Sequence, residues 1–123
     1  LHLIEPLAFR LEQPQLRRAG LDYADLAQVS VHHSLELCLQ ALTGARLYAV
    51  ETGGSRAYSE AHFRSGDALL FGPETRGLSI AALSLVAPEN VLRIPMRPSN
   101  RSLNLANAVA LVVYEAWRQQ GFR

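Results

Sequence analysis

Two polar loops stand out because they combine turn-forming residues, arginines and small polar side chains between apolar flanks. They span residues 69–78 (LLFGPETRGL) and 94–107 (IPMRPSNRSLNLAN). Each loop follows a short apolar stretch and leads into a helical pattern. Because loops held on a rigid scaffold often carry the function of a domain, the sequence predicts a ligand site that both loops share.

The basic residues indicate an anionic partner. Every one of the 12 basic side chains is an arginine, whose planar guanidinium suits phosphate, although the base composition of a genome would produce the same bias. From residue 91 onward, five arginines accompany a single acid, Glu115. A local basic surface is typical of a nucleic-acid partner, but the net charge of the whole chain is only +1.

The hydrophobic pattern predicts the elements that must position these loops. The length of 123 residues and the hydrophobic fraction of 49% fit one globular domain, residues 1–123. Strands alternate with helices, which predicts an α/β domain with a mostly parallel sheet flanked by helices. Ligands bind such sheets at the carboxyl ends of the strands, where residues 50–54, 72–77 and 95–102 fall. The expected strands are 1–5, 28–32, 46–50, 67–71 and 91–94, the expected helices 35–42, 79–86 and 103–119, and the expected helical turns 15–20, 22–26 and 59–63.

The last predicted helix is apolar on all its faces. A helix of this kind is buried on all sides, and one sheet of a small domain covers only one side of it. We therefore expect a homodimer built on this helix, with Tyr114 and Trp117 extending the interface. The alternative is that loops of the same chain bury it. Tyr114 could reach a site across the dimer, although simple packing is favoured.

The remaining composition excludes several function classes. The longest apolar stretches, near residues 106–114, are too short to span a bilayer. His32 and His33 would point to opposite faces of a strand, and His2 and His62 show no ligand spacing, so no metal site is expected. Cys38 lies among leucines and is expected in the core. A single cysteine fits a reducing, cytoplasmic location.

Several motifs resemble those of the SPOUT methyltransferases. They are FGPETRGL (residues 71–78), RIPM (93–96) and RSLNLANAVALVVYEAWRQQGF (101–122), together with LRRAGLDY (16–23) and the opening LHLIEP. The resemblance covers essentially the whole chain. Within that class the chain is most similar to the small tRNA 2′-O-methyltransferases that modify the wobble nucleotide.

This resemblance implies a C-terminal deep trefoil knot and S-adenosylmethionine as methyl donor. It places the cofactor near Val50, Gly72, Ile94 and Ser102. The implied reaction transfers a methyl group to a ribose 2′-hydroxyl of tRNA at the wobble nucleotide. Two alternatives remain open: the same chemistry on another RNA such as ribosomal RNA, and a catalytically silent module for RNA binding or dimerisation.

One part of the family pattern is absent from this sequence. The family normally begins with a strand and helix that carry Asn-x-Gly-Asn-x-x-Arg, and the arginine there is usually given the activating role at the ribose. We therefore expect the sequence to be an N-terminally incomplete version of a longer protein. A molecule that truly started at Leu1 is expected to be inactive and marginally folded.

The residues and the resemblance together imply roles for individual side chains, and for Glu74 and the RNA-contacting arginines it is the resemblance that favours a function. Glu74, in the first loop, and Asn104 are the expected catalytic residues, and Asn107 is expected to tie neighbouring loops, because both asparagines would share one face of an apolar helix. Ser102 is expected to cap that helix while contacting the cofactor. Gly72 and Gly77 permit a tight turn, and Arg76 could contact a phosphate or form a surface ion pair. The expected RNA-binding residues are Arg17, Arg18, Arg97 and Arg101.

Overall fold

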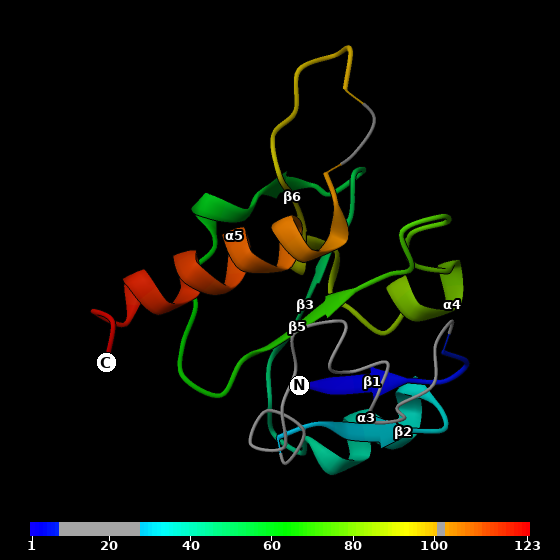
Figure 1. Ribbon diagram of the computed structural model, residues 1–123. Helices are drawn as coiled ribbons and strands as arrows, with labels where there is room; N and C mark the ends of the chain where they lie inside the picture. Colours follow the sequence, from blue (N-terminus) through cyan, green and yellow to red (C-terminus); the bar gives the residue numbers. More distant parts are fainter. Residues whose placement is uncertain (8–27, 101–102) are drawn as a thin grey trace, which may run out of the picture. The chain divides into compact units, whose positions relative to one another are not determined.

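A computed structural model describes residues 1–7, 28–100 and 103–123 of the chain (Figure 1). It divides into two compact units, Leu1–Gly44 and Ala45–Arg123, and each is described by itself. The helical turns expected at residues 15–20 and 22–26 lie outside the described residues. No helix in the described ranges is both long enough and apolar enough to cross a membrane.

The first unit pairs two short strands beside one helix. β1 (His2–Ile4) and β2 (Ser30–His32) run parallel, with His2 opposite Ser30 and Ile4 opposite His32. Helix α3 (Leu35–Ala41) follows directly. It begins as predicted because the Ser34 hydroxyl accepts the backbone N–H of Leu37 at 3.2 Å, which satisfies a donor that has no partner within the helix.

The second unit is built on a four-stranded sheet in which all neighbours are parallel, as predicted. The spatial order is β4-β6-β3-β5, so the last strand in the sequence lies between two earlier ones. Three of the strands are short apolar runs that were predicted, whereas β4 has only two residues and gives no periodic signal. The strands are β3 (Leu47–Val50), β4 (Arg56–Ala57), β5 (Ala68–Phe71) and β6 (Val91–Arg93).

Four helical segments connect or follow these strands. They are η1 (Tyr58–Glu60), α4 (Ile80–Leu83), η2 (Pro88–Asn90) and α5 (Leu105–Gln119). The helix predicted over residues 79–86 is shorter than expected. The N–H groups of Leu85 and Val86 bond to carbonyls three residues back, at 3.1 Å each, so the chain tightens into turns before Pro88.

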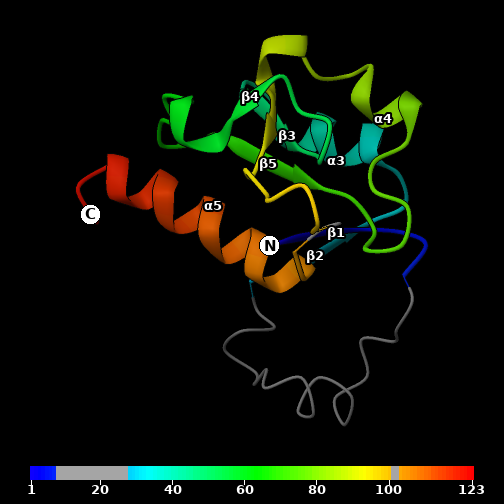
Figure 2. The same cartoon turned by 90° about the horizontal axis from the view of Figure 1, so that it is seen from above.

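The core of the second unit lies between the sheet and α5, which runs along one face of the sheet (Figure 2). Val112 and Leu92 are fully buried, and Tyr48 packs edge-on against Phe63 with ring centroids 5.1 Å apart. The Gln119 side chain accepts the N–H of Phe63 at 2.8 Å and donates to Ala61 O at 2.9 Å. The C-terminal end of α5 is therefore fastened to the loop before β5.

A bidentate ion pair joins the segments that enter β3 and β5. The Arg46 guanidinium donates to both carboxylate oxygens of Asp67, at 2.7 and 2.8 Å. Burial alone would raise the pKa of Asp67, but the hydrogen bonds from Arg46 and from the Arg64 N–H outweigh it and hold this pKa below its usual value. The pair thus fixes the register at which the two strands start.

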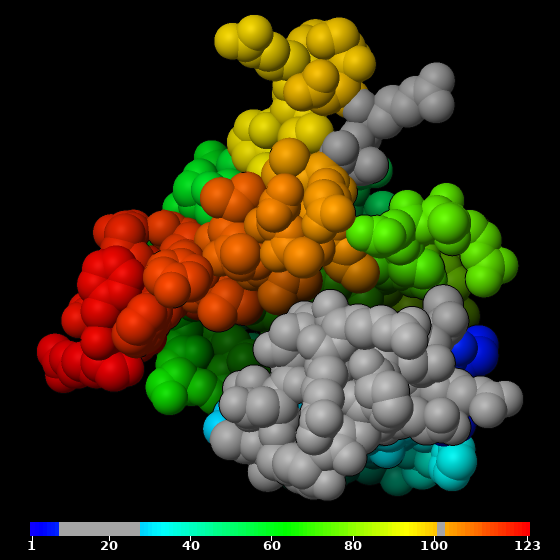
Figure 3. Space-filling model, viewed as in Figure 1, coloured from blue at the N-terminus to red at the C-terminus, as the bar shows by residue number. Residues whose placement is uncertain are grey.

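The described residues of the single chain do not cover α5 on every face, which counts against the alternative that loops of the same chain bury it. Within α5, Val112 is the only fully buried residue. An inward stripe is formed by residues 105, 108, 109, 112, 115, 116 and 119, whereas the opposite stripe is exposed. Orange and red side chains of α5 lie on the surface in Figure 3. The large members of the exposed stripe on the helix are Val113, Tyr114 and Trp117, which are 44%, 61% and 42% exposed, and Leu103, just before the helix, is 37% exposed. Described loops of the same chain therefore do not cover this apolar stripe.

Candidate functional site

A cavity of about 280 Å³ opens where three neighbouring strands end. Segments that follow β6, β3 and β5 form its walls, and the first turns of α5 close one side. The carboxyl ends of adjacent parallel strands are where such sheets bind ligands. Its lining is Val50, Glu51, Thr52, Phe71, Gly72, Pro73, Glu74, Thr75, Arg76, Gly77, Ile94, Met96, Leu103, Leu105 and Ala108.

The first loop is folded back tightly on itself by two glycines. The Gly77 N–H donates to Pro73 O at 2.9 Å, and Gly77 has a φ of 67°, a conformation that other residues rarely adopt. A Cβ on Gly72 would lie only 2.4 Å from the carbonyl carbon of Gly77. Gly72 is therefore required by close approach of the backbone, and Gly77 by both its φ and its neighbours.

Glu51 holds this loop from the end of β3. Its Oε2 accepts the Leu78 N–H at 2.7 Å and its Oε1 accepts the Thr52 N–H at 3.3 Å. A side chain on Gly77 would collide with the same carboxylate, with Cβ 2.7 Å from Oε1. The loops after β3 and β5 are thus joined by a charge-assisted hydrogen bond.

Glu74 and Asn104 both accept backbone N–H groups at the start of α5. The Asn104 side chain accepts the N–H groups of Ala106 and Asn107, at 2.9 and 3.4 Å. Glu74 Oε1 accepts the Leu105 N–H at 3.2 Å. An acidic side chain at a helix N-terminus is favourable because of the unpaired N–H groups and the helix dipole. The first loop is therefore linked to the start of α5, the helix that follows the second loop.

Three expectations about this helix start need correction. Asn104, not Ser102, is the N-cap, and the helix begins at Leu105. Since asparagine and serine are equally good N-caps, the sequence alone could not choose between them. Asn104 and Asn107 do not share a helix face, because Asn104 precedes the helix. Asn107 is exposed, so it is not the buried tie between loops that we expected.

The structure brings several predicted site residues together. Val50, Gly72 and Ile94, expected at the cofactor, all line the cavity, and so does Glu74, while Asn104 lies between two lining residues. Arg97 is exposed on the loop after β6. Four predicted residues lie outside the described ranges: Arg17, Arg18, Arg101 and Ser102.

Sequence reasoning missed three parts of this site. Glu51 was not singled out, although a carboxylate directly after a buried strand was a usable signal. Phe71 and Met96 provide apolar walls, and both were treated only as parts of motifs. Their position beside the cavity follows from the strand order, which the sequence pattern does not reveal.

Comparison with known proteins identifies the family. Residues 1–114 match the model of the SpoU rRNA Methylase family. The chain belongs to this family. The resemblance to SPOUT methyltransferases drawn from the loop motifs is therefore confirmed.

Relatives in the SpoU family are similar over nearly the whole chain. The tRNA (cytidine(34)-2′-O)-methyltransferase of Methylovorus glucosotrophus is 51% identical over 122 residues, which cover 99% of this chain and 79% of that protein. The Escherichia coli protein of the same name is 49% identical over 122 residues, with 99% and 78% covered.

Solved structures of the SpoU class share the fold. One, described by the words "Structural insights into the 2-OH methylation of C/U34 on tRNA", is 48% identical, has a TM-score of 0.88, and is matched over 99% of this chain and 79% of its own. The SpoU methyltransferase AviRb from Streptomyces viridochromogenes, solved with AdoMet, is 25% identical with a TM-score of 0.83, over 99% of this chain and 50% of its own. The predicted fold, including the trefoil knot that characterises this class, is confirmed.

Proposed function

We propose that this protein transfers a methyl group from S-adenosylmethionine to the ribose 2′-hydroxyl of the wobble nucleotide of tRNA. The observation that carries the proposal is the cavity at the ends of β6, β3 and β5, lined by Val50, Gly72 and Ile94. The names of the relatives that are 51% and 49% identical support the tRNA substrate and the modified position.

The residues of this cavity fit the proposed cofactor. Its volume of about 280 Å³ is close to the lower end of small-molecule sites, about 300 Å³. Apolar side chains of Val50, Ile94 and Met96 suit an adenine ring, while Glu51 and Thr52 offer polar groups for a ribose or an amino acid. When bound, S-adenosylmethionine supplies a methyl group already activated by its positive sulfur.

The protein's own contribution is to position the hydroxyl and help it lose its proton. We assign this role to Glu74 and Asn104. Both side chains are fixed at the start of α5 by the hydrogen bonds described above. Rigid placement is what such a reaction requires, since the electrophile needs no further activation. Ser102 is proposed as a further cofactor contact, and Arg17, Arg18, Arg97 and Arg101 as contacts to RNA phosphates.

A homodimer formed through α5 is part of the same proposal. The exposed stripe carries a tyrosine and a tryptophan whose ring centroids lie 5.6 Å apart, and Trp117 also packs edge-on against Phe122. Aromatic side chains are enriched in protein interfaces, and an exposed apolar stripe without a partner is uncommon on a monomer. A tRNA substrate also leads us to propose a cytoplasmic location. We further propose that the reaction uses no metal.

The decisive experiment measures transfer of labelled methyl groups to purified tRNA and to ribosomal RNA, followed by mapping of the methylated nucleotide. The proposal expects label at the 2′-oxygen of tRNA position 34. Label confined to ribosomal RNA would replace the substrate, and absence of any transfer would favour a silent module. Calorimetry with S-adenosylhomocysteine separates these cases, because a silent module without a cofactor pocket gives no binding heat.

A further inference from the structure

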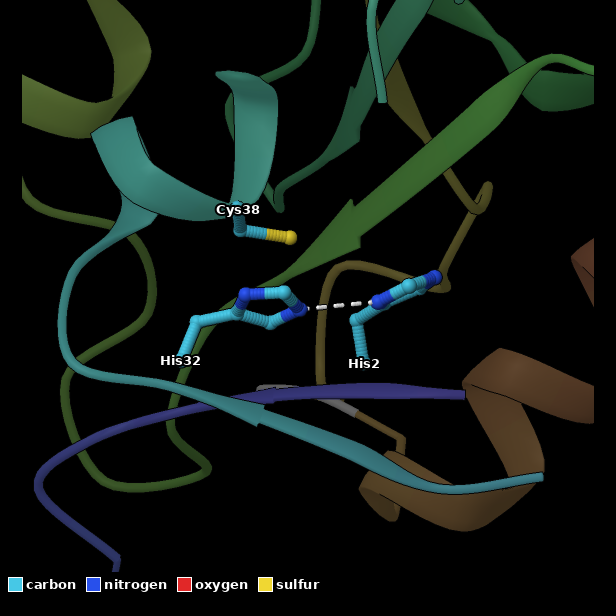
Figure 4. A group of neighbouring side chains, drawn as sticks. All are labelled: His2, His32 and Cys38. Atoms are coloured by element: carbon cyan, nitrogen blue, oxygen red, sulfur yellow. Dashed lines mark hydrogen bonds between the residues drawn. The ribbon is translucent and has the colours of Figure 1, made fainter. Parts of the chain in front are cut away.

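The first unit gathers two imidazoles and one thiol outside the proposed methyltransfer site. His2, His32 and Cys38 each offer one metal-ligating atom, and these atoms all lie within 4.8 Å of one another. His2 Nδ1 and His32 Nε2 are 3.0 Å apart. Figure 4 shows both rings rising from the paired strands toward α3, while Cys38 points back from α3 toward them.

The strand pairing explains why sequence spacing did not reveal this cluster. β1 and β2 are parallel with Ile4 opposite His32, so His2 and His32 lie on the same face, two residues apart in register. His33 follows β2 directly, and its Nδ1 contacts Glu5 Oε2 at 2.7 Å. Of the two adjacent histidines, His32 meets the distant His2, whereas His33 meets Glu5.

We propose that His2, His32 and Cys38 form a binding site for a zinc-type transition-metal ion. Imidazole nitrogen and thiolate sulfur are the ligands that Zn²⁺ prefers. The proposal concerns the first unit alone and does not depend on methyl transfer.

The distances are close to those that tetrahedral coordination requires. With Zn–N bonds of about 2.0–2.1 Å and a Zn–S bond of about 2.3 Å, ligand atoms lie about 3.3 Å apart for two nitrogens and about 3.6 Å apart for nitrogen and sulfur. The nitrogens are already at 3.0 Å. Because the three ligand atoms all lie within 4.8 Å of one another, each nitrogen–sulfur separation must shorten by at most about 1.2 Å to reach about 3.6 Å.

Binding has a defined proton balance. One imidazole donates a proton to the other in their mutual hydrogen bond. When this proton moves to the second nitrogen of the donor ring, both facing nitrogens are free to bind the metal. The Cys38 thiol must lose its proton, because thiolate is the ligand. One proton is therefore released for each metal bound. His2 is exposed, so a water molecule can occupy the fourth position.

The site would add a tie between the described elements of the first unit. Cys38 is the only buried residue among the described residues of this unit. A metal held by β1, β2 and α3 would connect all three described elements of the unit at one point. We therefore expect zinc to stabilise the folded protein, since ligand bound only by the native state raises stability.

The test is titration of the tag-free full chain with Co²⁺ and then Zn²⁺. Because Cys38 is the only cysteine, a thiolate-to-cobalt charge-transfer band can arise from no other residue. We expect one Co²⁺ per chain, with this band and tetrahedral visible absorption, both lost when Zn²⁺ is added. Absence of a thiolate band in the wild type would overturn the proposal without relying on any variant.

Variants then identify the ligands. Cys38→Ser should remove the charge-transfer band, and His2→Gln and His32→Gln should each weaken Zn²⁺ binding at least about tenfold, as even losses of outer-shell partners do. His33→Gln and His62→Gln are matched controls that should bind like the wild type. Circular dichroism checks that each variant is folded. Equal losses in His33→Gln and His2→Gln would show that the proposed ligand set is wrong.

Discussion

Replacing Gly72 by alanine tests whether the first loop forms the cofactor site. The added Cβ would lie 2.4 Å from the Gly77 carbonyl carbon and 2.5 Å from the Leu78 nitrogen, whereas ordinary contacts are 3.4–4 Å. The two backbone segments must therefore separate by about 1 Å. Both neighbours are backbone atoms, so no side-chain rotation can relieve the overlap.

The functional loss follows from this displacement. A misplacement of about 1 Å can lower the rate of an enzyme reaction about 100-fold, which corresponds to about 2.7 kcal/mol, and we take a loss of the same order for the cofactor that this loop is proposed to contact. We expect Gly72→Ala to weaken S-adenosylhomocysteine binding by about this factor. We also expect a loss of about 1–3 kcal/mol in unfolding free energy, typical of overpacking. Isothermal titration calorimetry measures the first quantity and urea unfolding the second.

Gly53→Ala is the matched control. Gly53 follows Thr52 at the same edge of the sheet, but a Cβ there meets nothing within 4 Å. It should bind S-adenosylhomocysteine like the wild type. If Gly72→Ala also binds like the wild type, the tight loop is not part of the cofactor site and the proposed pocket is wrong.

Three other substitutions test the remaining surfaces. Arg97→Glu should weaken tRNA binding and reduce the slope of log K against log salt concentration by about one unit, with Arg123→Glu as control. An unchanged slope would show that Arg97 does not contact RNA. Val113→Arg should shift the protein toward monomer in analytical ultracentrifugation, whereas Ile80→Arg, at an 88% exposed site in α4, should not; a wild type that is monomeric at every concentration would refute the dimer. Hydrogen bonds from Arg118 and then Gln119 lower the pKa of Glu115 to about 2. Its contribution is therefore present above its usual pKa of 4.5 and is lost as pH falls toward 2. Glu115→Gln should cost about 1 kcal/mol at pH 7, because Arg118 is largely exposed, and much less at pH 3; an equal cost at both pH values in urea unfolding would contradict this account.

The positions of Val50, Gly72 and Ile94 could be predicted because parallel strands bring their carboxyl ends to one edge. A buried apolar run followed by a glycine or polar residue is visible in the sequence, and the family motifs mark the same positions. The strand order, with β6 between β4 and β3, could not be predicted from the pattern. Because β6 lies next to β3, Ile94 and Met96 line the same cavity as Glu51.

Local competition explains the errors at the start of α5. Ser102 and Asn104 are both good caps, and only the position of Glu74, brought in from another loop, adds a second acceptor at Leu105. Gln119 is a similar case, since its side chain binds backbone groups more than 50 residues earlier. Such contacts depend on tertiary neighbours, and no periodicity in the sequence reports them.

The two stripes of α5 explain why the sequence predicts that this helix is buried on every side. One stripe, centred on Val112, packs on the chain's own sheet, and the other, from Leu103 to Trp117, is apolar without being covered by described residues. Hydrophobicity reports that both stripes avoid water, but it does not say which molecule covers each. Leu103 also lines the cavity, so a partner seated on the outer stripe would reach the wall of the proposed cofactor site. Val113 lies away from the cavity lining, and a change there therefore separates an effect on assembly from a direct effect on the pocket.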